Sequence, residues 1–87
     1  MNWHHKNNLL EKDFNFETFR DALKFVCEVA KIADKINHHP DILIHNYNKV
    51  RVQTTTHSEG QITQKDYELI AKILEINVNL LKEGDEL

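Results

Sequence analysis

The sequence lacks the residues that mark cross-linked, irregular or membrane-spanning chains. Cys27 is its one cysteine, so an internal disulfide and a cysteine-rich metal site are both excluded. Two glycines and one proline predict long regular elements joined by short connections. The apolar runs are short, far below the roughly 20 residues that a membrane-spanning helix needs.

An excess of positive charge is also missing. The 11 Lys and Arg residues against 14 Asp and Glu residues give a net charge of −3, so no basic footprint predicts binding to nucleic acid or to an anionic membrane. Residues 1–6 contain no apolar segment of the kind found in a secretory signal. With 29% charged and 40% hydrophobic residues, the chain is expected to form one globular domain, residues 1–87, in the cytoplasm.

The first half of the chain predicts two short strands and a long helix. Alternation over residues 3–16 favours strands, and Asn7-Asn8 favours a hairpin turn because Asn tolerates positive φ. Over residues 17–37, apolar residues recur at three- and four-residue spacing, which predicts one helix. Cys27, beside this apolar stripe, is expected to be a small packed thiol. The helix must end before Pro40, since the residue preceding a proline is pushed out of helical geometry.

The second half predicts two more strands and a second helix. Strand patterns occur over residues 42–44 and 50–56, with a turn at residues 46–49. Thr63 is expected to cap the helix, with Asp66 three residues later closing its first turn. The apolar face of this helix is predicted to contain Leu69, Ile70, Ile73, Leu74, Leu80 and Leu81. The order strand-strand-helix-strand-strand-helix predicts an α+β fold, a four-stranded antiparallel sheet with two helices packed on one face.

Six histidines are the most unusual feature of the composition. Three interpretations compete: surface polar residues, a metal site, or acid–base chemistry. Zinc sites on helices favour histidines four residues apart, whereas His38 and His39 are adjacent and adjacent side chains usually diverge, so no metal is expected. His4, His5 and His45 are interpreted as surface residues.

His38 and His39 follow directly after the last turn of the first predicted helix. Unpaired carbonyls and the negative end of the helix dipole favour a charged imidazole there. Asp34 lies four residues before His38, so its carboxylate reaches this imidazole if helical geometry persists. Pro40 then fixes the backbone after the two histidines.

His57 ends the second pair of predicted strands, and Asp66 lies nine residues later in the first turn of the second helix. An Asp66 carboxylate in this place could accept a hydrogen bond from the His57 imidazole and select its tautomer. The competing interpretation is that Asp66 only closes the start of the helix. Spacing alone leaves both interpretations open.

Taken together, these residues resemble the pterin-4a-carbinolamine dehydratase family. The matching pattern begins with an acidic residue, Asp34, shortly before the His38-His39-Pro40 motif. It continues with an aromatic residue, a later histidine and a later aspartate, which are Tyr47, His57 and Asp66. Trp3 corresponds to a tryptophan that precedes the first strand of the family, and the resemblance extends over residues 3–76.

The resemblance implies a hydro-lyase that dehydrates a 4a-hydroxytetrahydropterin to a quinonoid dihydropterin and water. This reaction recycles the tetrahydrobiopterin used by aromatic amino acid hydroxylases. The resemblance also implies that no metal or organic cofactor is used, and that the chain forms homodimers or homotetramers by joining sheets and packing helices. Many members carry an N-terminal helix that this sequence is expected to lack. The site implied for the pterin contains His38, His39 and His57, supported by Asp34, Pro40 and Asp66.

The chemistry of these groups leads to a hypothesis of acid–base catalysis. His38, kept partly charged by Asp34, is assigned as the general acid, and His57, oriented by Asp66, as the general base. The acid and base labels are interchangeable at this point, because an imidazole with a near-neutral pKa serves either purpose.

The same hypothesis assigns substrate contacts and leaves rival functions open. His39 is expected to hydrogen-bond the pterin, and Trp3 either stacks on its ring or belongs to the core or an interface. One rival function is a non-enzymatic partner-binding or assembly factor on the same fold, and the other is a histidine-rich metal binder. The enzyme is favoured because a scaffold needs no such set of histidines and aspartates.

Overall fold

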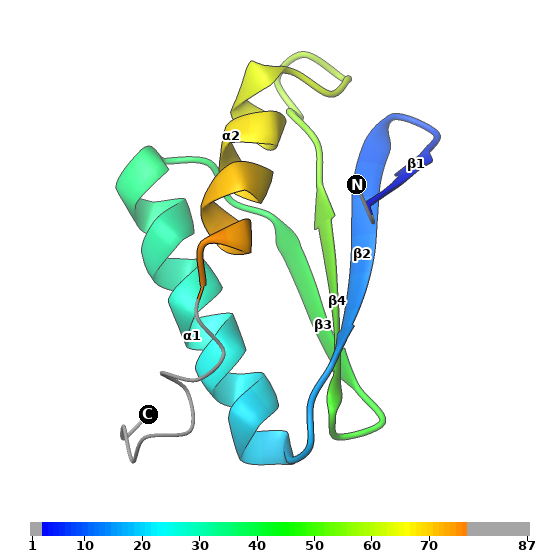
Figure 1. Ribbon diagram of the computed structural model, residues 1–87. Helices are drawn as coiled ribbons and strands as arrows, with labels where there is room; N and C mark the ends of the chain where they lie inside the picture. Colours follow the sequence, from blue (N-terminus) through cyan, green and yellow to red (C-terminus); the bar gives the residue numbers. More distant parts are fainter. Residues whose placement is uncertain (1–2, 77–87) are drawn as a thin grey trace.

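A computed structural model describes residues 3–76 of the chain (Figure 1). Its elements in chain order are β1 (His4–Lys6), β2 (Leu9–Asn15), α1 (Phe19–Ile36), β3 (Asp41–His45), β4 (Lys49–Thr54) and α2 (Gln64–Leu74). The predicted order of strands and helices is therefore confirmed. Within this part of the chain, no helix has the length and apolar character required to cross a membrane.

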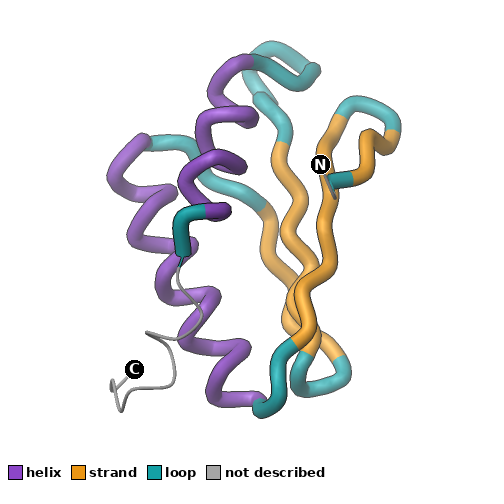
Figure 2. The backbone as a smooth tube through the Cα atoms, in the orientation of Figure 1, coloured by secondary structure: helices purple, strands orange, loops and turns teal. Residues whose placement is uncertain are grey.

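The four strands form one antiparallel sheet in the order β1-β2-β4-β3. Val50 on β4 lies opposite both Phe14 on β2 and Ile44 on β3, so these three side chains share a face. Both helices cover this apolar face, as predicted (Figures 1 and 2). The alternate residues of the strands, such as Asp13 and Arg51, lie on the opposite face, which we call the open face.

Local capping residues set the ends of α1. The Thr18 hydroxyl accepts a hydrogen bond from the Asp21 amide at 3.0 Å, and Asn37 ends the helix in the left-handed conformation with φ 55°. The amides of Asn37 and His38 both donate to the Ala33 carbonyl. The helix is slightly shorter than the predicted residues 17–37, and its closing hydrogen bonds fix the backbone at His38.

The core lies between the sheet and the two helices. Its buried apolar residues are Trp3, Leu10, Ala22, Phe25, Val29, Val50, Val52, Leu69, Ile70 and Ile73. Lys12 is a charged residue on the same face of β2, and it places its ammonium group 5.1 Å from the centroid of the Phe14 ring. Cys27 is exposed on α1, so the prediction of a packed thiol is wrong: the residue lies outside the stripe that faces the core.

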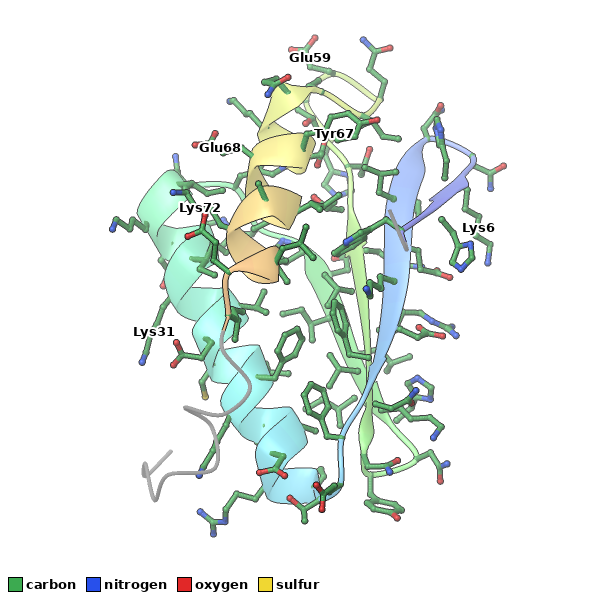
Figure 3. All side chains as sticks on the ribbon, viewed as in Figure 1. Lys6, Lys31, Glu59, Tyr67, Glu68 and Lys72 are labelled. Atoms are coloured by element: carbon green, nitrogen blue, oxygen red, sulfur yellow. The ribbon has the colours of Figure 1, made fainter. Side chains whose placement is uncertain are left out.

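The prediction for α2 holds for most of its length and fails at its end. Leu69, Ile70 and Ile73 are buried, but Leu74 is 59% exposed. Leu74 is the last helical residue and is rotated by about 100° from Ile73, which turns its side chain off the core. The predicted core residues Leu80 and Leu81 lie outside the described residues. Glu68 and Lys72 project from the side of α2 that faces away from the sheet (Figure 3).

Candidate active site

The folded chain brings His38 and Asp66 together, although 28 residues separate them in the sequence. His38 follows the end of α1, and Asp66 lies in the first turn of α2. The His38 Nε2 atom is 2.7 Å from Oδ1 of Asp66. The Asp66 side chain is fully buried and the His38 side chain is 11% exposed, so water screens this pair little.

Three further groups hold the Asp66 carboxylate. The Thr54 hydroxyl donates to Oδ1 at 2.6 Å, beside the bond from His38. The Thr56 hydroxyl donates to Oδ2 at 2.8 Å, and the Thr63 amide donates to the same oxygen at 2.9 Å. Four bonds fill the acceptor positions of a carboxylate. Asp66 therefore closes the start of α2 with Oδ2, as one of the two interpretations of the sequence predicts, and with Oδ1 it holds His38 and not His57.

These hydrogen bonds keep Asp66 ionised despite its burial. Burial alone raises the pKa of Asp66, but the bonds from Thr54, His38, Thr63 and Thr56 together lower it below the ordinary value of 3.8. An ionised carboxylate only accepts hydrogen bonds, so each of its four neighbours must donate. The network therefore assigns a proton to Nε2 of His38 and leaves Nδ1 of the neutral ring as the hydrogen-bond acceptor.

The hydroxyl groups around Asp66 are ordered in one direction. Because Thr56 donates its proton to Asp66, the Thr63 hydroxyl, 2.6 Å from the Thr56 hydroxyl, must donate to it. Thr63 in turn accepts a bond from the Lys65 amide at 3.3 Å as the cap of α2. The capping residues of α2 are thus part of the hydrogen-bond network that holds His38.

His39 has its own carboxylate partner, which is Asp34. The His39 Nε2 atom lies 2.9 Å from Oδ1 of Asp34, and both side chains are largely exposed. The prediction that Asp34 pairs with His38 is therefore wrong. Asn37 takes the left-handed conformation and ends helical geometry before His38, so the four-residue spacing no longer brings the two side chains together. As an exposed pair, Asp34 and His39 contribute little to stability.

His57 is exposed and follows Thr56, which is bonded to Asp66. It lies at the start of a turn in which Thr56 forms an isolated bridge with Gln61 and the Gly60 amide donates to the His57 carbonyl. The prediction that Asp66 orients His57 is wrong, because the Asp66 oxygens are occupied by other donors. The turn nevertheless places His57 next to the network along the chain.

Thr54 and Thr56 are the residues of this network that the sequence interpretation missed. The sequence pattern identifies both only as strand residues, yet their spacing of two puts both on one side of an extended chain. That side faces the helices, since Thr54 lies opposite Leu10 on β2 and both are buried. A polar side chain at a predicted core position was the available signal, because buried hydroxyl groups need a partner.

Trp3 and Pro40 occupy different surroundings. Trp3 is 8% exposed and packs its ring edge-on against Phe14 at a centroid distance of 6.0 Å, which places it in the core. Its Nε1 atom is buried and has no hydrogen-bond partner within residues 3–76. Pro40 is half-buried between His39 and the first residue of β3.

The remaining histidines lie apart from this network. His4 and His5 are exposed on β1, as expected for surface residues. His45 is half-buried, and its Nε2 atom is buried without a hydrogen-bond partner in the described part of the chain. His45 is therefore not a purely surface residue. Among residues 3–76, no group of three or more His, Cys, Asp or Glu side chains is arranged to hold a metal ion.

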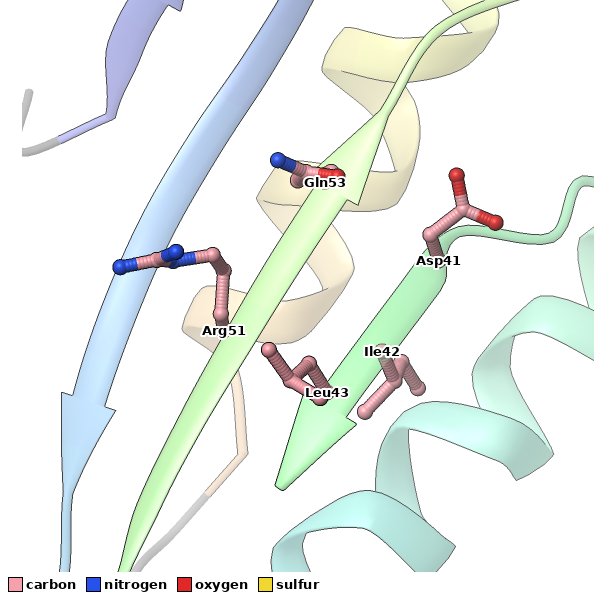
Figure 4. Close-up of a pocket in the computed structure, with 5 residues that line it drawn as sticks. All are labelled: Asp41, Ile42, Leu43, Arg51 and Gln53. Atoms are coloured by element: carbon pink, nitrogen blue, oxygen red, sulfur yellow. The ribbon is translucent and has the colours of Figure 1, made fainter. Parts of the chain in front are cut away.

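A depression of about 160 Å³ lies at the β3 edge of the sheet, and most of its lining residues belong to the open face (Figure 4). It is lined by Asp41, Ile42, Leu43, Arg51 and Gln53. Arg51 leans toward β2, where it donates two hydrogen bonds to Asp13 at 2.8 and 3.2 Å and thereby lowers the pKa of Asp13. The depression is separated from Asp66 by the sheet, since Thr54 points to the opposite face.

Comparison with known proteins gives a consistent result. The profile of the family described as pterin 4 alpha carbinolamine dehydratase matches residues 1–76. A protein of Sulfolobus acidocaldarius is 45% identical over 74 residues, which cover 85% of this chain and 80% of that protein. A protein of Sulfurisphaera tokodaii is 51% identical over 74 residues, which cover 85% and 78%. Both carry the provisional name pterin-4-alpha-carbinolamine dehydratase.

Two solved structures share the fold. The crystal structure of a transcriptional coactivator/pterin dehydratase from Brucella melitensis has a TM-score of 0.77 and 29% identity, with 92% of this chain and 81% of that chain covered. A pterin dehydratase-like protein identified as a RuBisCO assembly factor in the alpha-carboxysome has a TM-score of 0.63 and 18% identity, with 95% and 89% covered. At that identity the second likeness concerns the fold alone.

Proposed function

Because the chain belongs to the pterin 4 alpha carbinolamine dehydratase family, we propose that it converts a 4a-hydroxytetrahydropterin to a quinonoid dihydropterin and water. The observation that carries the proposal at the level of the site is the buried pair of His38 and Asp66. A buried carboxylate that fixes the tautomer of an imidazole is a recurring arrangement in enzymes that transfer protons.

The reaction requires two proton transfers. The C4a–O bond breaks, the adjacent ring nitrogen N5 loses its proton, and the hydroxyl group leaves as water once it is protonated. A positioned base and a positioned acid each contribute typically 10²–10⁴-fold to such a step. These two proton transfers account for every atom in the reaction, so we propose that it needs neither a metal nor an organic cofactor.

We assign the base to His38. Asp66 holds the Nε2 proton, so Nδ1 carries the lone pair that accepts the proton from N5. The imidazolium formed in this step is then stabilised by the buried Asp66 carboxylate. This exchanges the labels derived from sequence, because the partner of His38 is Asp66 and not Asp34.

The acid is then assigned to His57. It follows Thr56 directly, and Thr56 hydrogen-bonds Asp66, so the backbone at His57 lies close to the His38 network. Its exposure allows it to regain a proton from water after each turnover. We propose that His39, held by Asp34, contacts the pterin and that Pro40 restricts the backbone beside it. Stacking of Trp3 on the pterin has less support, since the ring is buried against Phe14.

The test is stopped-flow absorbance of freshly generated 4a-hydroxytetrahydropterin, with and without the protein, from about pH 6 to 9. The protein should accelerate dehydration. His38→Ala and His57→Ala should each lose about 10²–10⁴-fold while remaining folded. His4→Ala is the matched control, because His4 is an exposed histidine on β1, and it should keep the wild-type rate. A normal rate in His38→Ala would contradict the assignment of the base.

Tetrahydrobiopterin recycling is the proposed physiological setting. Comparing 4a-hydroxy derivatives that differ in the pterin side chain tests this point. A preference for the biopterin derivative supports it, whereas equal rates for all side chains contradict it.

We also propose that the chain forms a homodimer or homotetramer. β3 is an edge strand of the sheet, and Leu43 on it is 52% exposed beside the depression described above. An exposed edge with an apolar side chain favours pairing with another strand. Light scattering coupled to gel filtration should give twice or four times the 10.3 kDa mass of one chain, and a monomer would contradict the proposal.

A partner-binding function is the second candidate. It is favoured by large apolar side chains exposed on the helices, which are Phe19, Tyr67 and Leu74. Two proteins of this fold, one described as a transcriptional coactivator/pterin dehydratase and the other as a RuBisCO assembly factor, give it a precedent. A folded protein without dehydratase activity would support this candidate over the enzyme.

A further inference from the structure

Thr54 is an unusual residue for its position in the sheet. On β4 it continues the inward-facing row of Val50 and Val52, and it is 2% exposed. A hydroxyl group in such an apolar row costs free energy unless it is hydrogen-bonded, whereas a valine there would cost nothing of the kind. The Thr54 hydroxyl donates to Oδ1 of Asp66 at 2.6 Å, the oxygen that also holds His38.

We infer that Thr54 is a positioning residue that sets the proton affinity of His38 through the shared Oδ1 atom of Asp66. The role of His38 in this inference rests on the proposed dehydratase function. Thr54 and His38 both bond to Oδ1 of Asp66, so Thr54 acts on the His38 ring through the carboxylate between them. Its effect on the reaction is therefore an effect on how strongly His38 keeps a proton.

The direction of the effect follows from the two bonds to one oxygen. A donor hydrogen bond draws negative charge on Oδ1 toward the Thr54 hydroxyl, which leaves less of it to stabilise the imidazolium form of His38. Removing the hydroxyl returns that charge to His38 and raises its proton affinity. The carboxylate stays in place, because Thr56 and Thr63 hold Oδ2.

Other charged groups lie on the elements around Asp66. They include His5 on β1, Lys12 on β2, Lys24 and Asp34 on α1, His39 before β3, His57 after β4 and Lys65 on α2. The hydrogen bonds to the Asp66 carboxylate come from other groups, namely Thr54, Thr56, Thr63 and His38. These charged groups are the same before and after a change at Thr54, so a comparison of variants isolates the hydroxyl.

The experiment is an NMR titration of the His38 ring in the full chain, with the signals assigned by their loss in His38→Gln. Thr54→Val keeps the β-branched shape and removes the hydroxyl, and it should raise the titration midpoint of His38 by up to about 1 pH unit, the upper limit set by one hydrogen bond that acts through the carboxylate. The acid limb of the pH–rate profile should move by the same amount. Thr54→Ser keeps the hydroxyl and should restore the wild-type midpoint.

The matched control is Thr55→Val. The Thr55 hydroxyl donates to the Asn8 carbonyl and not to Asp66, so the His38 midpoint should stay unchanged. Thr54→Ala removes the same hydroxyl with a smaller side chain, and it replaces Thr54→Val if circular dichroism shows that the valine variant is unfolded. An unchanged His38 midpoint in a folded variant without the Thr54 hydroxyl would overturn the inference.

The titration and the rate assay separate this inference from the proposed function. The midpoint is measured on the ring and needs no turnover. A shifted midpoint in a protein that does not accelerate dehydration would overturn the dehydratase function and support the coupling between Thr54 and His38. Normal turnover with an unmoved midpoint would overturn the coupling alone.

Discussion

Replacing Asp66 by asparagine should separate its two tasks, because an amide offers one oxygen where the carboxylate offers two. The four donors divide evenly: His38 and Thr54 on Oδ1, Thr56 and the Thr63 amide on Oδ2. The Thr63 backbone N–H cannot become an acceptor, whereas a histidine can change its tautomer and a hydroxyl can rotate. We therefore expect the asparagine oxygen to face Thr63 and its NH₂ group to face His38.

In that orientation α2 keeps its cap, whereas His38 no longer has the carboxylate that keeps its proton on Nε2. The loss of bonds to a charged acceptor, worth about 1.5–3 kcal/mol each against about 1 kcal/mol for neutral bonds, should lower the free energy of unfolding by roughly 1–3 kcal/mol. The His38 proton moves to Nδ1, the atom assigned as base. Dehydration should therefore slow by about 10²–10⁴-fold, as expected when an imidazole is held in the wrong tautomer.

Urea unfolding gives the stability of Asp66→Asn, ring ¹⁵N chemical shifts give the His38 tautomer, and stopped-flow absorbance gives the rate. Asp13→Asn is the control, since it alters an exposed carboxylate on the open face and should change the unfolding free energy by less than about 1 kcal/mol with no change in rate. An Asp66→Asn protein with the wild-type rate and unchanged His38 shifts would refute the reasoning.

Two further predictions concern stability. Asn37 adopts φ 55°, so Asn37→Ala should cost about 1–2 kcal/mol in urea unfolding, whereas Asn37→Gly should be within a few tenths of a kcal/mol of wild type; equal losses in both would contradict the capping role. The pKa of Asp66 lies below 3.8, so its contribution to stability is present above that pH and is lost as the pH falls through the lower pKa of the folded state. Asp66→Asn should flatten the acid side of a plot of stability against pH, and an unchanged acid slope would show that other groups control it.

Much of the fold could be predicted from sequence because its signals are local. The three- and four-residue spacing before Asn37, the turn at Asn7-Asn8 and the cap formed by Thr63 and Asp66 depend on neighbours in the chain. Two side chains were placed wrongly: Cys27 is exposed in the middle of α1, and Leu74 is exposed at the end of α2. Leu74 turned out exposed at the last turn of α2, because helical periodicity does not say where the core stops.

The candidate site was predicted in its members but not in its pairs. The sequence pattern identifies both His38 and Asp66 as site residues, but it pairs His38 with Asp34 and Asp66 with His57. The spacing of Asp34 and His38 assumes a continuous helix, which the left-handed Asn37 ends. His57 is not bonded to Asp66 because other donors occupy the carboxylate oxygens.

The sequence by itself determined which elements form, the order in which they come, and that Asp66 would close the first turn of α2. Only the tertiary structure decided that the end of α1 meets the start of α2, so that His38 reaches Asp66 across 28 residues. The physical reason is that periodicity and capping act within a few residues. The pairing of His38, Thr54 and Asp66 instead depends on packing two helices against one face of the sheet, which buries a carboxylate where three separate segments supply its donors.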